Sequence, residues 1–509
     1  MVLDDGVTAR LGPDHFQMTT TTGGAAGVLS WLERWLQTEW PQLRVFLSSV
    51  TDHWATAAVV GPRSRDVLRK VCPDIDFSAE AFPFMTWREG MVAGVPARVF
   101  RISFSGELAY EVNVDANLGR HVWEALFAAG EEYGITPYGT ETMHVLRAEK
   151  GYIIVGQETD GSMTPHDLGL GGMVKKKGDF IGRRSLARSD MLRPDRKQLV
   201  GLLTTDGATV LPEGAQLVDR PGPERPIPMV GHVTSSYMSP ALGRSIALAM
   251  VKGGLGRMGE TVHALLTDGR AVPAVITRPV FLDPENARMN PPELARRPAA
   301  VSLPEPKANS PLVGLAARRG SGQGALELYE RPLLAQVGLR GHAEDPAFRA
   351  AVASVTGLEP PRQPNRWLAA GELRLFWLGP DEWLIQAPAE RETSLVQGLR
   401  RALEGRHAAV TVLSGGQTVL GLRGAEAARV LAKGCTLDLH PRALKAGDCA
   451  QTRLAKANVL LHRLPEGDGF EITVRRSFAD YLWRWLADAG AAHGLEALAP
   501  PPATMARAA

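Results

Sequence analysis

Cysteine is scarce in this sequence, since Cys72, Cys435 and Cys449 are the only three in 509 residues. Three cysteines cannot build a disulfide framework, which favours a reducing compartment such as the cytoplasm. No apolar run approaches the roughly 18 residues of a membrane span, and the N-terminus has no basic stretch followed by an apolar one. We therefore expect a cytoplasmic protein with neither a signal peptide nor a membrane partner.

Net charge is nearly absent as well. The 57 basic and 55 acidic side chains leave a formal charge of +2, so the chain has no overall field that would attract nucleic acid. The twelve histidines and three cysteines form no HExxH and no CxxC motif, so we expect no metal site. The composition is otherwise that of a globular protein, 44% hydrophobic and 22% charged, and its length requires at least two domains.

Three blocks of sequence occur twice in the same order. The letters LGPD stand at residues 11–14 and again at 378–381. Residues 59–72 resemble 421–435, and residues 110–134 resemble 470–494 at a constant offset of 360. Repeats in one order indicate two copies of one module. We predict a mixed α/β (α+β) fold of two related modules, the first followed by a β-rich subdomain.

A proline-rich stretch separates the two copies. Six prolines lie within residues 283–310, where they remove backbone donors and disfavour helix, so we expect a semi-rigid linker. The C-terminal residues 496–509 are expected to be disordered. Copy two has some seventy residues between the linker and its LGPD block, whereas copy one has ten residues before LGPD. If the copies are homologous, copy one lacks an opening strand and helix.

Local patterns predict the elements of copy one. Apolar spacing predicts helices over 28–36, 64–71 and 120–128, and strands over 57–60 and 97–104. A further helix should end near Gly151 and lead into a strand over 152–157. Arg147 and Glu149 are candidates for an ion pair at that bend.

Two sets of carboxylates are candidates for chemistry. Asp4 and Asp5 follow a short apolar start, and a buried member of such a pair would have a raised pKa. From spacing alone, a solvated Asp-Gly turn is the simpler interpretation. Glu111 lies between Tyr110 and Val112 in a predicted strand, where a buried carboxylate needs donors such as the adjacent amino and ring N–H groups of a planar heterocycle. An edge-strand glutamate is the alternative, and Glu471 repeats it in copy two.

Several motifs resemble, in order, those of the folate-binding aminomethyltransferase family, the family of the glycine-cleavage T-protein. They are DDG at residues 4–6, SFSGELAYEV from Ser103, LRAEKGYIIVGQE from Leu146, DFIGRRSL from Asp179, SPALGRSIALAMV from Ser239 and VPAVITRPVF from Val272. In detail, these motifs are more similar to those in the C-terminal half of the alpha subunit of heterotetrameric sarcosine oxidases. The part after the linker resembles the gamma subunit of those enzymes.

The resemblance implies a domain organisation. Residues 1–198 would form a folate-binding aminomethyltransferase-like domain with a truncated N-terminus, and residues 199–282 its β-rich C-terminal subdomain. Residues 311–495 would form a gamma-subunit-like domain after the 283–310 linker.

The resemblance also implies the site residues. Asp4 would be the catalytic aspartate beside the reacting folate nitrogens, and Glu111 would hold the pterin, with Tyr110, Phe104 and His144 as further folate contacts. The T-protein pattern has an arginine four positions before Arg147, where this sequence has Met143. That departure favours the sarcosine oxidase branch of the family.

The implied function is that of a subunit of a sarcosine oxidase-like complex. It would bind tetrahydrofolate and capture the one-carbon unit of sarcosine as 5,10-methylenetetrahydrofolate. No dinucleotide fingerprint is present, so flavin and NAD are expected on other subunits, one of them a flavoprotein. A free-standing aminomethyltransferase and a non-catalytic assembly subunit with a vestigial folate pocket are the alternatives.

Copy two is predicted to have no chemistry of its own. The LGPD offset of 367 places Gly371 and Glu372 at the positions of Asp4 and Asp5. Only Glu471 persists from the candidate site, so we expect copy two to act in docking and assembly.

Overall fold

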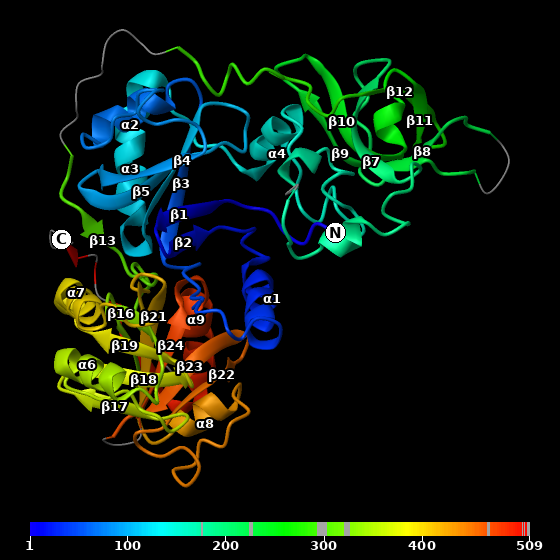
Figure 1. Ribbon diagram of the computed structural model, residues 1–509. Coiled ribbons are helices and arrows are strands. Elements are labelled where there is room, and N and C mark those ends of the chain that lie inside the picture. Colours follow the sequence, from blue (N-terminus) through cyan, green and yellow to red (C-terminus); the bar gives the residue numbers. More distant parts are fainter. Residues whose placement is uncertain are drawn as a thin grey trace.

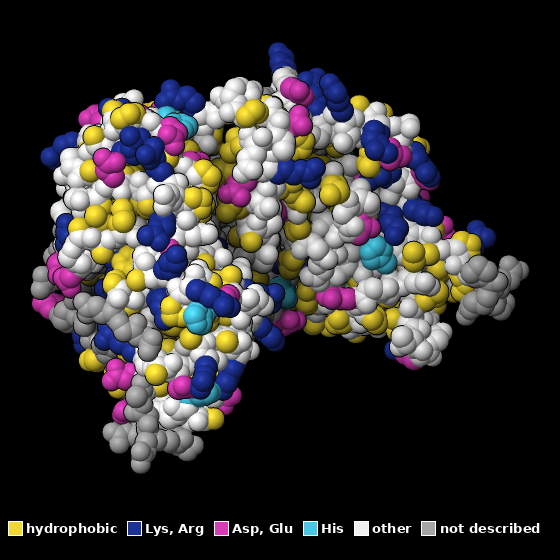
Figure 2. All heavy atoms as spheres, turned by 90° about the horizontal axis from the view of Figure 1, so that it is seen from below, with side chains coloured by type: hydrophobic (Ala, Val, Ile, Leu, Met, Phe, Trp, Pro, Cys, Tyr) yellow, Lys and Arg dark blue, Asp and Glu magenta, His cyan; other side chains and the backbone are white. Residues whose placement is uncertain are grey.

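The computed structural model describes residues 1–174, 177–222, 227–292, 303–319, 326–465, 469–500, 502 and 504–505. Figure 1 shows a four-stranded sheet with its helices and a β-barrel side by side, and the second module below them. The predicted fold class, mixed α/β with two related modules and a β-rich subdomain, is confirmed. Basic and acidic side chains are interspersed on the face seen from below (Figure 2), as expected for a net charge near zero.

The first module begins with a hairpin and a helix. Strands β1 (Thr8–Gly12) and β2 (His15–Met18) pair antiparallel, and α1 (Ala25–Thr38) follows. The apolar stripe predicted for 28–36 lies within α1, but no residue of α1 is buried. The stripe is partly buried, and Val28 and Leu32 from it line the cleft between the modules.

A four-stranded antiparallel sheet forms the body of the first module. Its order is β3-β6-β5-β4, and its strands and helices are β3 (Trp54–Val60), α2 (Ser64–Val71), β4 (Thr86–Val92), β5 (Val95–Arg101), β6 (Ala109–Asp115) and α3 (Gly119–Gly130). Helices α2 and α3 cover one face, where alternate strand residues such as Val99, Tyr110 and Val112 form the core. The other face is open to the cleft.

Strand β5 is shorter than predicted. The alternating pattern suggested a strand to residue 104, but β5 ends at Arg101. The backbone N–H of Gly106 donates to Ser103 Oγ at 3.1 Å, and the N–H of Glu107 donates to Ser105 Oγ at 3.2 Å. These side-chain hydrogen bonds hold a turn in place of further strand.

Helix α4 (Thr140–Glu149) ends near Gly151, as predicted, but no strand follows it. Gly151 has a φ of +74°, and a Cβ there would lie 2.5 Å from the Pro279 carbonyl oxygen, so only glycine fits. Residues 155–158 form a turn instead of the predicted strand, in which the N–H groups of Gln157 and Glu158 donate to the Ile154 carbonyl.

The predicted pair of Arg147 with Glu149 is wrong. Arg147 donates to the Glu158 carboxylate at 2.9 Å and to Ser235 Oγ at 2.6 Å, and both partners of the ion pair are fully buried. Glu149 accepts a hydrogen bond from Ser239 Oγ at 2.5 Å. Both side chains therefore attach the end of α4 to the barrel.

The barrel closes in the order β10-β7-β12-β11-β8-β9. Its strands are β7 (Lys197–Thr204), β8 (Gln216–Val218), β9 (Gly231–Ser239), β10 (Arg244–Lys252), β11 (Thr261–Leu265) and β12 (Ala271–Thr277), and the short α5 (Arg183–Leu186) precedes them. Its inward side chains are aliphatic, including Val200, Leu202 and Ile276.

The second module contains two sheets. One has the order β14-β25-β15-β21-β24-β23-β22, the other β17-β18-β19-β16-β20. The elements are β14 (Arg318–Arg319), β15 (Leu326–Arg331), β16 (Ala335–Arg340), α6 (Pro346–Thr356), β17 (Trp367–Ala370), β18 (Leu373–Gly379), β19 (Glu382–Ala387), α7 (Glu392–Ala402), β20 (Ala409–Val412), β21 (Gln417–Arg423), α8 (Ala427–Ala432), β22 (Cys449–Leu454), β23 (Ala457–Arg463), β24 (Gly469–Arg475), α9 (Ala479–Gly490) and β25 (Leu495–Ala497).

The LGPD segments are equivalent hairpin turns, which supports the predicted duplication. Gly12 pairs with His15 between β1 and β2, and Gly379 pairs with Glu382 between β18 and β19. Each hairpin has its register irregularity just before that glycine. The equivalents differ in their surroundings, because β1 and β2 form a two-stranded sheet whereas β18 and β19 belong to a five-stranded one.

Parts of the linker and of the tail contact other segments of the chain. Asn290 Oδ1 accepts a hydrogen bond at 2.8 Å from Arg101, a buried side chain that needs acceptors, and Met289 is buried. The first part of the linker thus packs on the first module, while residues 293–302 lie outside the described part. In the tail, β26 (Thr504–Met505) pairs with β13 (Lys307–Ala308).

Candidate ligand-binding site

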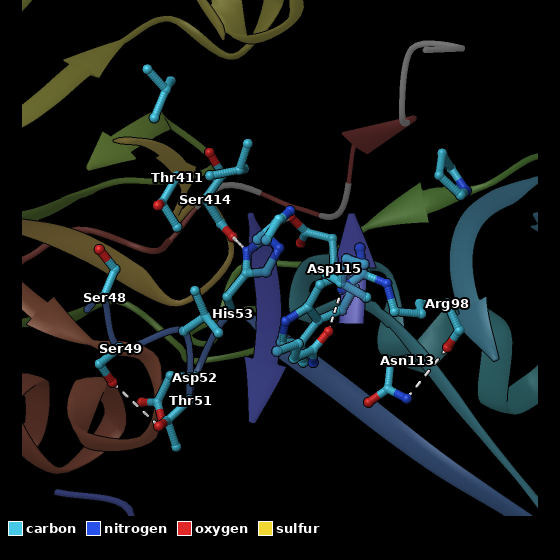
Figure 3. A pocket seen from close by; sticks show the side chains of 18 of the residues that line it. Ser48, Ser49, Thr51, Asp52, His53, Arg98, Asn113, Asp115, Thr411 and Ser414 are labelled. Atoms are coloured by element: carbon cyan, nitrogen blue, oxygen red, sulfur yellow. Dashed lines mark hydrogen bonds and ion pairs between the residues drawn. The ribbon is translucent and has the colours of Figure 1, made fainter. Parts of the chain in front are cut away.

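A cleft of about 2880 Å³ lies between the two modules. The open face of the four-stranded sheet, the β1–β2 hairpin, α1 and residues 44–54 line it from the first module. The second module contributes residues from three segments, 332–334, 388–393 and 406–414. Most, but not all, residues of these segments face the cleft. Figure 3 shows part of its wall, where His53, Asp115 and Asn113 come from the first module and Ser414 from the second.

Glu111 lines the cleft from the middle of β6. Because side chains alternate along a strand, Tyr110 and Val112 enter the core and Glu111 points to the open face. Burial raises the pKa of the Glu111 carboxyl. No hydrogen bond or ion pair joins this carboxylate to any of the described residues, so its acceptors remain available to a ligand.

The Tyr138 hydroxyl lies close enough to the Glu111 carboxylate to be influenced by its charge. Partial burial raises the pKa of the Tyr138 hydroxyl, and the negative charge of Glu111 raises it further. Tyr138 precedes α4 and therefore brings a phenol near Glu111 from a different part of the first module.

A row of polar side chains crosses the sheet next to Glu111. Thr56 Oγ1 donates to Asn113 Oδ1 at 2.6 Å, and the Asn113 amide donates to the Arg98 carbonyl at 3.3 Å. The Arg98 guanidinium donates to Glu89 at 2.7 Å and contacts the side-chain oxygen of Gln17 on β2. This row fastens the β1–β2 hairpin to the sheet and gives the cleft a polar floor beside the free carboxylate.

Asp4 is held at the start of α1, outside the set of residues that line the cleft. Its carboxylate accepts hydrogen bonds from the Thr21 hydroxyl at 3.0 Å, the Thr21 N–H at 3.2 Å and the Asp5 N–H at 2.8 Å. Burial and the neighbouring charge of Asp4 raise the pKa of Asp5. Thr20 and Thr22, which flank the Asp4 partner, do line the cleft, so Asp4 lies behind its wall.

The other predicted site residues lie elsewhere. Tyr110 is fully buried against Phe77 and Phe82, so its side chain belongs to the core rather than to the cleft. Phe104 is 37% exposed and stacks on Tyr152 with 6.1 Å between ring centroids. His144 lies on α4, 3.7 Å from Glu141. Of the five residues predicted to act on folate, only Glu111 lines the cleft.

Polar contacts join the modules at the inner end of the cleft. His53 Nδ1 makes a close hydrogen bond with the Ser414 carbonyl (Figure 3), and burial lowers the pKa of this histidine. Asp115, at the end of β6, accepts a hydrogen bond from the Asn117 N–H at 2.7 Å. Burial raises the pKa of Asp115 to about 7, although the Asn117 hydrogen bond and the charge of Arg476 oppose the shift.

The signal for part of this site was present in the sequence. Asn113 is two positions from Glu111 and must share its face of the strand, so alternation alone identifies it. The contributions of Arg98 and Ser414 depend on the pairing of distant segments, and no local pattern contains them.

Neither a metal-binding cluster nor a membrane-spanning helix occurs among the residues that the structure describes. They contain no group of three or more His, Cys, Asp or Glu side chains placed to hold a metal ion. They also contain no helix that is both long enough and apolar enough to cross a membrane.

Comparison with protein families divides the chain into three regions. Residues 1–178 match the GCVT N-terminal domain, and residues 197–283 match the glycine cleavage T-protein C-terminal barrel domain. Residues 340–492 match the sarcosine oxidase gamma subunit family.

Sarcosine oxidase subunits and aminomethyltransferases are among the relatives of this chain. The sarcosine oxidase subunits alpha of Corynebacterium sp. (strain P-1) and Rhizobium meliloti (strain 1021) are 55% and 44% identical over 291 and 293 residues, 57% of this chain in each case. The chain spans only 30% of the length of either protein. An aminomethyltransferase of Thermotoga sp. (strain RQ2) is 29% identical over 280 residues, 55% of this chain and 72% of that protein.

Solved structures of a sarcosine oxidase and of an aminomethyltransferase are among those similar to this chain. A heterotetrameric sarcosine oxidase from Corynebacterium sp. U-96, in complex with pyrrole 2-carboxylate, is 34% identical, with a TM-score of 0.32 over 34% of this chain and 88% of that one. Aminomethyltransferase T of the glycine cleavage system from Bartonella henselae is 22% identical, with a TM-score of 0.46 over 55% of this chain and 73% of that one.

Proposed function

We propose that this chain, in which two GCVT domains are followed by a region of the sarcosine oxidase gamma subunit family, is a tetrahydrofolate-binding subunit of a sarcosine oxidase-like complex. Its 55% identity to a sarcosine oxidase subunit alpha supports the complex. The aminomethyltransferases among its relatives support a one-carbon carrier as the ligand.

Glu111 is the observation that carries the folate proposal. Its carboxylate is half-buried, lines the cleft and has no partner among the described residues. A pterin ring presents an amino group and a ring N–H side by side, which matches the two oxygens of a carboxylate. A ligand of this kind would supply the donors that a buried carboxylate requires.

In the reaction that we propose, the sarcosine nitrogen loses a proton and its N-methyl group loses a hydride, which a flavin on a partner subunit would accept. The product is the iminium CH₂=NH⁺–CH₂–COO⁻. Two folate nitrogens bind its CH₂ group and release their two hydrogens to the departing nitrogen, which leaves 5,10-methylenetetrahydrofolate and glycine. Keeping the iminium within the complex limits its hydrolysis to formaldehyde. This chain would supply the folate site, and the flavin and NAD would belong to other subunits.

Asp4 is proposed to stabilise the positive iminium carbon and to accept a proton from a folate nitrogen. Three N–H and O–H donors from Thr21 and Asp5 fix the orientation of its carboxylate. To act in this way, Asp4 has to reach the cleft past the Thr20–Thr22 wall, which requires a shift of the segment that carries it.

A free-standing aminomethyltransferase is the second candidate, because relatives with that name align over 72% of their length. Glycine formation from sarcosine by the reconstituted complex supports the first candidate. Transfer from an aminomethylated lipoyl carrier in the absence of a flavoprotein supports the second.

The proposal is tested by calorimetric titration of the full chain with tetrahydrofolate. Glu111→Gln should weaken binding about 10- to 100-fold, since a charge-assisted hydrogen bond contributes about 1.5–3 kcal/mol. Glu305→Gln is the matched control, because Glu305 is an exposed carboxylate in the wall of the same cleft. Equal affinity of Glu111→Gln and Glu305→Gln would remove Glu111 from the site, and a wild-type chain that binds no tetrahydrofolate would contradict the proposal.

A further inference from the structure

Glu111 and Glu471 occupy equivalent positions in the two modules. Each follows an aromatic core residue, Tyr110 or Phe470, in a central strand of its sheet. Each glutamate therefore points to the sheet face opposite the helices. In the first module this face borders the cleft, whereas in the second it is covered by the sheet that contains β18 and β19.

Two arginines of the second module surround Glu471. Arg374, from β18, donates from both terminal nitrogens: one contacts Oε2 closely and the other lies 3.4 Å from Oε1. Arg331, from β15, donates to Oε2 at 3.0 Å, and the Tyr329 hydroxyl donates to Oε1 at 3.4 Å. Glu471 is only 1% exposed, so all of these contacts are internal.

The guanidinium of Arg374 has the shape of a small planar ligand. It presents two parallel N–H donors to the carboxylate, the arrangement of any amidine or 2-amino heterocycle. It lies over the indole of Trp367, 5.7 Å from the ring centroid. By the LGPD offset of 367, the first module has Val7 at the position of Arg374, and valine offers Glu111 no donor.

We infer that the second module retains a binding site for a planar amidinium-type group, and that its own Arg374 side chain fills this site. The site consists of the Glu471 carboxylate, the Trp367 indole and the donors of Arg331 and Tyr329. The link to a ligand at Glu111 rests on the proposed function, but the binding chemistry at Glu471 does not.

The Glu471 carboxylate is buried, and a buried negative charge needs a cationic partner. Burial by itself would raise the pKa of Glu471, but the charges of Arg374 and Arg331 outweigh it and the pKa is lowered. His462 lies 3.7 Å from Glu471, but burial lowers its pKa to about 3, so it is neutral and cannot replace the arginine charge. Removal of Arg374 leaves Arg331 and Tyr329 as donors to Glu471 and frees the side of the carboxylate that Arg374 occupied. That side should bind a small cation with paired N–H donors.

Chemical rescue of Arg374→Ala in the full chain tests this inference. Ethylguanidinium is the probe, because it corresponds to the atoms that the substitution removes. We expect it to raise the melting temperature of Arg374→Ala saturably at millimolar concentration, with no comparable effect on the wild type. Ethylammonium, which has the charge but not the paired donors, should have little effect.

A second variant and a second measurement complete the test. In Arg374→Ala/Glu471→Gln the carboxylate is gone, so ethylguanidinium should lose its effect. If Arg374→Ala does not fold, refolding yield with ethylguanidinium is compared with the yield with ethylammonium, and a higher yield with ethylguanidinium is expected. Equal effects of the two cations, or equal rescue of the double variant, would overturn the inference. No tetrahydrofolate is added, so this result is independent of the test at Glu111.

Discussion

Asp52 of the first module accepts two hydrogen bonds from Ser477 of the second, from the backbone N–H at 3.1 Å and from the hydroxyl at 2.6 Å. Arg476, the preceding residue, donates to Asn117 Oδ1 at 2.6 Å and to the Asn309 carbonyl at 3.0 Å. The segment that leads into α9 is thus attached to the first module and to the linker. Since the cleft lies between the modules, these contacts help to set its width.

We predict that Asp52→Ala loosens this attachment without unfolding either module. A hydrogen bond to a partly exposed carboxylate contributes about 1 kcal/mol, so the Ser477 amide should exchange with solvent about 5-fold faster. Hydrogen–deuterium exchange measured by mass spectrometry checks this on peptides that contain Ser477. Asp14→Ala, in the exposed β1–β2 turn, should leave the exchange unchanged. Unaltered protection in Asp52→Ala would mean that other contacts hold the modules together.

Asp115 should make the protein less stable as the pH rises from about 4 to about 7. Its pKa is raised from 3.8 to about 7, mainly by burial, so within this window the folded state binds more protons than the unfolded state. The free energy of unfolding then falls with increasing pH. His53, whose pKa burial lowers, acts in the opposite direction at acidic pH. The contribution of Asp115 is therefore isolated by comparison with Asp115→Asn.

Asp115→Asn keeps an acceptor for the Asn117 N–H but cannot ionise. Urea unfolding at a series of pH values should show a smaller decline for this variant than for the wild type between pH 4 and 7. The two proteins should differ most near pH 8, with the variant the more stable. Parallel pH profiles would show that Asp115 is not responsible.

Local sequence patterns predict turns and strand faces in this chain. The repeated LGPD letters predicted two related modules, and both copies form hairpin turns because a tight turn is specified by the residues within it. Strand alternation placed Tyr110 and Glu111 on opposite faces of one strand. Accordingly, Tyr110 lies in the core and Glu111 lines the cleft. Conversely, the sequence resemblance treated both as folate contacts, and only Glu111 lines the cleft.

Local patterns do not predict ion pairs between residues that are far apart in the sequence. Arg147 was paired with its neighbour Glu149, but the buried partner is Glu158, because the turn at residues 155–158 returns that carboxylate to the helix end. Similarly, Glu471 was recognised as a repeat of Glu111, whereas its partner Arg374 lies 97 residues away. A buried charge has to find its counter-charge wherever the fold brings one, and sequence separation does not limit that choice.

The Arg147–Glu158 pair should contribute strongly to stability. Arg147→Met leaves a buried carboxylate without its cation, which should lower the free energy of unfolding by about 3–5 kcal/mol. Arg147→Met/Glu158→Leu removes both charges and should be less destabilised than the single variant. Arg188→Met, which breaks an exposed pair with Asp190, should change stability by less than about 1 kcal/mol. Urea unfolding of the four proteins measures these differences, and equal losses for Arg147→Met and Arg188→Met would contradict the prediction.

Asp4→Asn should separate the two halves of the proposed reaction. In the reconstituted complex, sarcosine oxidation should continue, because the proposed reaction assigns the flavin to another subunit. Formation of 5,10-methylenetetrahydrofolate should fall about 100-fold or more, the usual effect of losing a general acid or base. Asp5→Asn, which alters the neighbouring carboxylate, is the matched control and should retain most of the folate product. An unchanged product yield in Asp4→Asn would exclude Asp4 from the mechanism.

The full chain should bind one tetrahydrofolate, not two. The second module repeats the glutamate of the proposed site, but Arg374 and Arg331 already occupy both oxygens of Glu471, which is 1% exposed. The LGPD offset also puts Gly371 at the position of Asp4, and Gly371 lies in the turn between β17 and β18 with no side chain to offer. Calorimetric titration should therefore give a stoichiometry of one in the wild type and a large loss of affinity in Glu111→Gln. A second equivalent of bound tetrahydrofolate that persists in Glu111→Gln would show that the second module binds folate after all, and that its internal arginine yields to the ligand.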